Sequence, residues 1–131
     1  MILCIYMPAL EKGEAVLKRL RQICCSLPNV TETKSWGHPN WRTGKKLFAS
    51  WDEYKGIQCI AFNAGFPLQD VLLQDPRFFY APYAGNRGWV CMKIDGKMDW
   101  SEIKELIQRS YSLADPKSIP KSKRPTSLKQ A

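Results

Sequence analysis

Histidine is nearly absent from this chain: His38 is the only one among 131 residues. A metal cage draws on several His, Cys or carboxylate side chains at characteristic spacing, and a catalytic triad needs a histidine between a nucleophile and an acid. The sequence has no CxxC, and no carboxylate pair stands beside His38. We therefore expect no metal site and no cofactor. Enzymatic activity stays open but is disfavoured.

Long apolar runs are also absent, since none approaches the roughly 20 residues that a membrane-spanning helix requires. The opening MILCIYMP is apolar, but it has neither a basic region nor a small-residue cleavage site, so a signal peptide is not expected. An odd number of cysteines without CxxC spacing is typical of reduced thiols; they are Cys4, Cys24, Cys25, Cys59 and Cys91. We expect a cytoplasmic protein with no membrane partner.

The length suits one domain, and 44% apolar with 24% charged residues is the composition of an ordinary globular protein. The net charge of +8 is unevenly spread. Of the 20 lysines and arginines, five lie beyond Asp115, which leaves 15 cations against 12 acids, or +3, in residues 1–115. The domain itself is therefore only mildly basic.

Residues 116–131 combine prolines with lysines and serines, and we expect them to form a basic disordered tail because they hold too little apolar surface to offset chain entropy. A solvated tail, a localisation signal and a phosphate-binding arm are the alternatives for it. Residues 1–9 are expected to be an N-terminal extension, and residues 10–115 to be the folded domain.

Three helices are expected. An amphipathic helix runs from Leu10 to Leu27, because apolar residues recur on one face and Pro28 then stops it. A short middle helix starts at Pro67 and ends before Pro76. Asp99 caps the last helix, with Glu102 at the reciprocal capping-box position. The core stripe of the last helix is Ile103, Leu106, Ile107 and Tyr111.

Strands alternate with turn residues between the first two helices. We expect strands near Thr31–Trp36, Lys45–Trp51 and Ile57–Asn63, with His38-Pro39-Asn40 as a turn between the first two. A further strand, Trp89–Ile94, follows an extended segment and a tight turn. In the second strand, alternation places Leu47, Ala49 and Trp51 on one face and Lys46, Phe48 and Ser50 on the other. The expected fold is α+β: a single domain with a mainly antiparallel sheet and helices over one face.

The stretch SWGHPNWRTGKKLFA, Ser35 to Ala49, holds the densest chemistry. Arg42, Lys45 and Lys46 lie beside Trp36 and Trp41, and cations with stacking groups are what nucleic-acid or nucleotide binding requires. An ordinary strand with inward Trp and outward Lys gives the same pattern, so both interpretations stay open.

Other candidates lie apart from this cluster. His38 is either a turn imidazole bonded to backbone or a site residue. The turn at residues 84–88 is either a plain hairpin or an anion site with Arg87 as donor. A pocket for a small anionic ligand is expected if the sheet brings together five residues: His38, Arg42, Tyr83, Arg87 and Trp89.

Four stretches carry a family resemblance: CSLPNVTE, SWGHPNWRTGKKLFA, RFFYAPYAGNRGWVCMKID and ELIQRSYSLA. With these motifs in order over most of residues 10–115, the chain resembles the YjbR/MmcQ family of small bacterial proteins. The resemblance implies a frataxin-like (CyaY-like) fold with the terminal helices packed together on one side. Members of the family are often labelled DNA-binding, by analogy to winged modules.

Three functional hypotheses follow. The first is a non-enzymatic DNA- or nucleic-acid-binding domain that uses Arg42, Lys45, Lys46 and Arg87 on phosphate. The second is a pocket for a small anionic or nucleotide-like ligand, built from Trp36, His38, Tyr83 and Trp89 with those cations. The third is a protein-interaction domain whose aromatic residues are simply core. The oligomeric state is not predicted.

Overall fold

The computed structural model describes residues 8–94 and 97–115, with the side chains of residues 8–12 left out. The expected N-terminal extension, apart from its last two residues, and the expected basic tail lie outside this part. The elements run in the order α2 (Pro8–Cys25), β1 (Val30–Ser35), β2 (His38–Thr43), β3 (Lys46–Tyr54), β4 (Ile57–Asn63), α3 (Leu68–Leu72), β5 (Phe78–Tyr80), η1 (Gly85–Arg87), β6 (Trp89–Lys93) and α4 (Trp100–Ala114).

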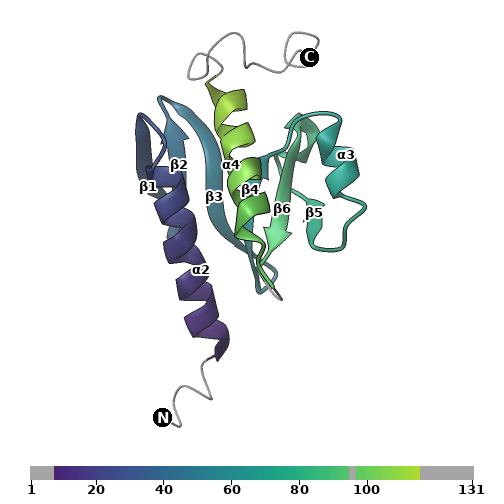
Figure 1. The fold of residues 1–131 in the computed structure, drawn as a ribbon. Helices are drawn as coiled ribbons and strands as arrows, with labels where there is room; N and C mark the ends of the chain where they lie inside the picture. Colours follow the sequence, from purple (N-terminus) through teal and green to yellow (C-terminus); the bar gives the residue numbers. More distant parts are fainter. Residues whose placement is uncertain (1–7, 95–96, 116–131) are drawn as a thin grey trace.

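The six strands form one sheet in the order β1-β2-β3-β4-β6-β5, and every neighbouring pair is antiparallel. Figure 1 shows α2 and α4 on the same face of the sheet, with α3 beyond β6 and β5. α4 contacts β3 and β4, while α2 contacts β1 and α4. The α+β fold expected from the sequence is confirmed, and one face of the sheet carries neither long helix.

The core lies between the sheet and the two long helices. The apolar stripe expected for the last helix is confirmed, since all four of its members are buried. From α2, Val16, Leu20 and Cys24 are buried against the same cluster. A fully buried side chain such as Leu20 contributes about 2 kcal/mol to stability. The helices therefore bind to the sheet through the periodic apolar positions that the sequence displays.

The region between α2 and β3 holds one strand more than expected. His38-Pro39-Asn40 is not a turn but the first half of β2, and the turn is Trp36-Gly37, with φ of 55° and 81°. Two positive φ angles match the twist of a two-residue hairpin. Pro39 fits because it lies opposite Lys34 in a non-hydrogen-bonded pair. Its missing N–H would point toward β3, which pairs with β2 only from Asn40 onward.

The face assignment within β3 was wrong for two residues because the strand contains a β-bulge. Trp41 pairs with Ala49, but Arg42 pairs with Leu47, so Phe48 is an extra residue. A bulge turns two successive side chains toward the same face. Phe48 is consequently fully buried under α4, edge-on to Tyr111 at 5.3 Å between ring centroids. Leu47 moves to the opposite face of the sheet.

At the start of α4 the expected Asp99 cap is confirmed, but the Glu102 side chain has a different partner from the one expected. The Asp99 carboxylate accepts a hydrogen bond from the Glu102 backbone N–H at 3.2 Å, as a helix N-cap does. The Glu102 carboxylate, however, accepts a hydrogen bond from Arg77 Nη1 at 2.8 Å. Arg77 also pairs with Asp75 at 2.8 Å. Arg77 thus ties the segment before β5 to the first turn of α4.

Glu32 on β1 connects α2 to the buried core. Its carboxylate accepts a hydrogen bond from the indole N–H of Trp41 at 2.9 Å and another from Arg21 Nε at 2.9 Å. Trp41 is fully buried, so its N–H depends on this acceptor. Partial burial raises the pKa of Glu32, but the hydrogen bonds from Arg21 and Trp41 outweigh it, and the pKa lies below its usual range.

We expect Glu32→Gln to lower the free energy of unfolding by about 1 kcal/mol at pH 7, because it replaces charge-assisted hydrogen bonds by neutral ones. A folded-state pKa below the unfolded value contributes stability that is present above the unfolded pKa and lost as pH falls through the folded one. The difference from the native protein should therefore shrink below about pH 4. Urea unfolding at pH 7, 4 and 3 measures it.

Glu53→Gln is the matched control, because Glu53 is exposed and makes no ion pair within the described part of the chain. A loss for Glu32→Gln that is equal at all three pH values would contradict a role for the Glu32 charge.

Candidate ligand-binding site

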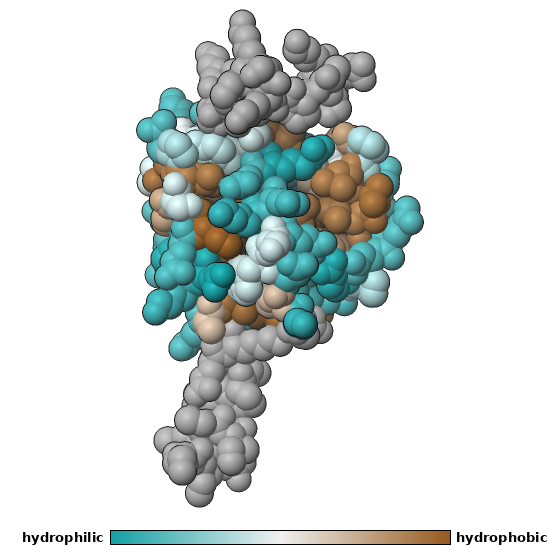
Figure 2. Space-filling model, viewed as in Figure 1, coloured by the Kyte–Doolittle hydropathy of each residue, from teal (hydrophilic) through white to brown (hydrophobic). Residues whose placement is uncertain are grey.

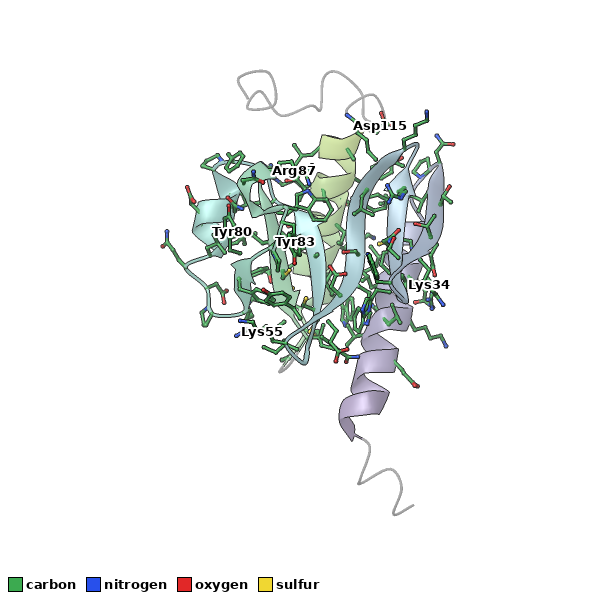
Figure 3. The ribbon with its side chains drawn as sticks, turned by 180° about the vertical axis from the view of Figure 1, so that it is seen from behind. Lys34, Lys55, Tyr80, Tyr83, Arg87 and Asp115 are labelled. Atoms are coloured by element: carbon green, nitrogen blue, oxygen red, sulfur yellow. The ribbon has the colours of Figure 1, made fainter. Side chains whose placement is uncertain are left out.

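The face of the sheet opposite α2 and α4, here called the open face, carries the polar side chains of alternate strand positions. Figure 3 views the molecule from this side and shows Tyr83 and Arg87 lying over it. Both come from the segment between β5 and β6, which crosses the end of the sheet. A second, smaller buried cluster lies under this segment and joins Cys59, Ala61, Ala81 and Cys91.

A cavity of about 550 Å³ opens on this face, within the range of small-molecule sites, about 300 to 1,000 Å³. It begins beside Leu113 and Ala114 at the end of α4 and continues over β3, β4 and β6. Its lining therefore comes from four segments that are far apart in the sequence. Only the folded sheet brings them together.

Small side chains make the hollow. In the middle row of the cavity floor, Ser50 pairs with Ala61, and Ala61 pairs with Cys91. These three side chains are small, as is Ala81 on the bordering segment, and all four line the cavity. The half-buried indole of Trp89 lines the same cavity and packs against the smaller buried cluster. The floor therefore consists of small side chains with one large aromatic residue beside them.

Two cations line one end of the cavity. Lys46 begins β3, Arg87 ends η1, and the side chains of both are exposed. Asn63 and Trp89, which pair with each other across β4 and β6, lie at the same end. Within the described residues neither Lys46 nor Arg87 forms an ion pair. Both positive charges are free to bind an anion.

A buried glutamine fixes the loop that carries Arg87. Gln69 of α3 is 3% exposed, and its amide Nε2 donates to the carbonyl oxygen of Gly85 at 2.6 Å and to that of Trp89 at 3.0 Å. These carbonyls lie on either side of Arg87 in the chain. The Gly88 carbonyl in turn accepts the N–H of Ala64 at 2.9 Å. The loop that carries Arg87 is therefore fixed by hydrogen bonds from both Gln69 and Ala64.

A carboxylate lines the opposite end. Asp52 of β3 is half-buried and accepts a hydrogen bond from the Ser50 hydroxyl at 2.8 Å. No cation pairs with it in the part of the chain that the structure describes. The cavity is therefore positive where β3 begins and negative further along the same strand.

Three of the described thiols, one beside the cavity and two at the end of α2, are poor nucleophiles. A hydrogen bond with Cys91 and burial together raise the pKa of Cys59 far above its usual range, which keeps the thiol protonated. Burial likewise raises the pKa of Cys24, on the inner face of α2. Cys25 is exposed, but burial of its sulfur and the nearby Glu32 carboxylate raise its pKa too. No thiolate is available at neutral pH among these three.

Three of the eight residues singled out from the sequence meet in the cavity: Lys46, Arg87 and Trp89. Tyr83 is 98% exposed, and its neighbours in the chain line the cavity while its own side chain does not. Trp36 is 97% exposed at the tip of the β1–β2 turn. The remaining three do not line the cavity either, namely His38 and Arg42 on β2 and Lys45 in the following turn.

Sequence reasoning missed the polar floor and the loop support. Ser50 and Asp52 sit two apart on a strand, which is a period-2 signal for one face, but the face could not be known to be open. Asn63 and Gln69 gave no signal at all. Gln69 stands on a short amphipathic helix, where a polar residue is ordinarily expected to face solvent.

Within residues 8–94 and 97–115, no three His, Cys, Asp or Glu side chains gather closely enough to hold a metal ion. Over the same ranges, no helix is long and apolar enough to cross a membrane.

Figure 2, viewed from the helix side, shows mostly hydrophilic residues over the middle of that face and an apolar patch over α3. Val71 of α3 is 59% exposed, and the nearby Phe66 is 52% exposed.

These features define a small two-layer α+β domain with one sheet face left open and hollowed. The model of the YjbR family matches residues 25–113, well over half of the chain, and the chain therefore belongs to the YjbR family. The family resemblance seen in the sequence motifs is confirmed.

Solved structures agree with this at the level of the fold. A Deinococcus radiodurans protein, DR2400, with a DUF419 domain, superposes with a TM-score of 0.68 at 20% identity, over 86% of this chain and 87% of that one. A Bacillus subtilis protein of the DUF1801 family reaches a TM-score of 0.50 at 14% identity, over 79% of each chain. Comparison with curated proteins gives no match.

Proposed function

We propose that this protein is a binding protein, not an enzyme, and that it holds a small anionic ligand in the open-face cavity. One observation carries the proposal: Lys46 and Arg87, 41 positions apart in the chain, line the same cavity beside Trp89. Cations without acidic partners that meet in a concave site concentrate positive potential there. An arginine adds a planar fork of N–H donors suited to phosphate or carboxylate.

The chemistry of the lining favours binding over catalysis. Among the described residues that line the cavity, Asp52 is the only carboxylate and Cys91 the only thiol, and no imidazole is present. Cys91 is itself buried, with 2% of its surface exposed. A nucleophile normally needs an adjacent base, and this set does not supply such a pair.

The electrostatic proposal predicts that Lys46→Ala and Arg87→Ala each weaken binding of inorganic phosphate about tenfold, the size of one charge-assisted hydrogen bond. Titration followed by NMR of the Trp89 indole N–H measures the affinity. Lys104→Ala is the matched control, because Lys104 is an exposed cation on α4 and does not line the cavity. Absence of saturable binding, or equal affinity in all variants, would contradict the proposal.

Nucleic-acid binding is the second candidate, favoured by the position of Arg42 and Lys45 just outside the cavity. Arg42 Nη1 donates to the Lys45 carbonyl at 3.2 Å, so the end of β2 is tied to the turn that leads into Lys46. A single-stranded nucleic acid that lies across the open face would place one nucleotide in the cavity and its neighbouring phosphates on this turn.

The helix side is less suited to a polyanion. On α2, Arg19 lies over the Trp100 ring at 5.4 Å and Arg21 pairs with Glu32, so two of its cations are already engaged. α4 exposes Glu105 next to Lys104.

Titration with a labelled single-stranded oligonucleotide at several salt concentrations tests this candidate. Open-face binding requires that Lys46→Ala and Arg87→Ala reduce both the affinity and its salt dependence. Affinity that is unchanged in both variants would assign any binding to other cations and remove this candidate.

A further inference from the structure

The cavity carries opposite charges at its two ends. The ligand should therefore have an anionic group at one end and hydrogen-bond donors at the other. Lys46 and Arg87 lie at the end formed by the Asn63–Trp89 pair, whereas Asp52 lies opposite Cys59 further along the sheet. Within the described residues, the only hydrogen bond that Asp52 accepts from a side chain comes from Ser50. A partly buried carboxylate without a cation is unfavourable unless hydrogen-bond donors satisfy it. A ligand with N–H donors would supply them.

The distance between the two ends is that of an elongated small molecule. From Asn63 to Cys59 along β4 the chain advances about 13 Å. Trp89 lies at the cationic end, half-buried, and packs against the small buried cluster of Cys59, Ala61, Ala81 and Cys91, so part of its indole stays exposed beside the cavity floor. A second aromatic ring can lie against the exposed part of the indole.

Resting on the proposed function, we infer that the ligand is a nucleoside monophosphate whose base carries an exocyclic amino group. Its phosphate binds Lys46 and Arg87, its base lies beside Trp89, and the amino group donates to the Asp52 carboxylate. The Ser50 hydroxyl, which donates to Asp52, holds that carboxylate in position.

The protein should bind a nucleotide with an exocyclic amino group more tightly than the matched nucleotide that has a carbonyl in its place. Adenosine monophosphate and inosine monophosphate differ chiefly in an amino group replaced by a carbonyl, and so do cytidine and uridine monophosphate. A carboxylate accepts from the amino group but repels a carbonyl oxygen, since both are acceptors. We expect the amino-bearing member of at least one pair to bind about tenfold more tightly. Isothermal titration calorimetry on the full chain measures all four, with inorganic phosphate as the fifth probe.

Asp52→Asn tests the residue that makes this choice. The amide keeps the shape and can still accept from Ser50, but it also donates, so the tenfold preference should disappear. Affinity for inorganic phosphate should stay unchanged, because phosphate binds at the other end, and this also shows that the variant is folded. Glu53→Gln is the control, since Glu53 is the next residue on the strand and does not line the cavity. Ser50→Ala, which retains the charge but frees the carboxylate, should reduce the preference.

The outcomes separate this inference from the proposed function. Phosphate binding that depends on Lys46 and Arg87, with no preference in either nucleotide pair, overturns the inference and leaves the proposed function intact. A preference that survives Asp52→Asn also overturns it. If none of the five probes binds, both the inference and the proposed function fail.

Discussion

Replacing Gly88 by alanine should lower the free energy of unfolding by about 3 kcal/mol. Gly88 has φ of +97°, a conformation that L-residues with a Cβ rarely adopt. An added Cβ would also lie 3.0 Å from the Cα and 3.1 Å from the N of Gly65, and 2.9 Å from Asn63 Oδ1. Because two of these three contacts are backbone, no side-chain rotation relieves them. Urea unfolding followed by tryptophan fluorescence measures the loss.

Gly37→Ala separates the cost of the positive φ from the cost of the close contacts. Gly37 also has a positive φ, +81°, but an added Cβ there would meet nothing within 4 Å. Its substitution should therefore cost only the conformational part, about 1 kcal/mol. Equal losses for Gly37→Ala and Gly88→Ala would contradict the close approach of the β5–β6 segment to Gly65.

The same substitution should impair the site. Gly88 stands between Arg87 and Trp89, and its carbonyl accepts hydrogen bonds from Ala64 and Gly65 at 2.9 and 3.3 Å. A displacement of this carbonyl moves the cation and the Trp89 indole together. We therefore expect phosphate binding to weaken at least as much in Gly88→Ala as in Arg87→Ala.

Local signals in the sequence predicted most of the fold. Asp99 as a helix cap and Pro67 at the start of a helix are decided by backbone groups within a few residues, and both are where the sequence places them. The apolar stripe of α4 is a period of 3.6 residues, and it is buried. Such features depend mainly on the chain immediately around them.

The errors came from interactions between strands. A turn was expected at Pro39 because proline removes a hydrogen-bond donor, but the β1–β2 register places that position where no donor is needed. Phe48 and Leu47 exchanged faces because a bulge shifts the β2–β3 register by one residue. Neither register nor bulge leaves a local mark, because each depends on how whole strands pair and pack.

The site lies beyond local signals for the same reason. Lys46, Arg87 and Trp89 were all singled out for their chemistry, but only the order β3-β4-β6 places them beside one another. Trp36 has the same side chain as Trp89 and a neighbouring basic cluster, yet it lies 97% exposed at a hairpin tip. Residue type alone therefore identified candidates, and topology selected among them.

The bulge in β3 gives the second large effect that we expect: Ser110→Ala should lower the free energy of unfolding by about 2 kcal/mol. Ser110 of α4 has no exposed surface. Its hydroxyl donates to the Phe48 carbonyl at 2.5 Å and accepts the Asn63 N–H at 2.9 Å. The substitution leaves the Phe48 carbonyl on β3 and the Asn63 N–H on β4 without the hydroxyl as a partner. The methyl group of alanine can neither donate nor accept a hydrogen bond.

Ser112→Ala on the same helix is the matched control, because the Ser112 hydroxyl only donates to the Gln108 carbonyl one turn earlier, at 3.0 Å. Such a bond duplicates what the helix backbone already makes, so the change should stay within about 0.5 kcal/mol. If Ser110→Ala were as mild, the bulge would not depend on the hydroxyl. If it is costly, phosphate affinity should fall with stability, since Leu47, next to Lys46 in the lining, reaches the cavity only because the bulge at Phe48 turns the strand.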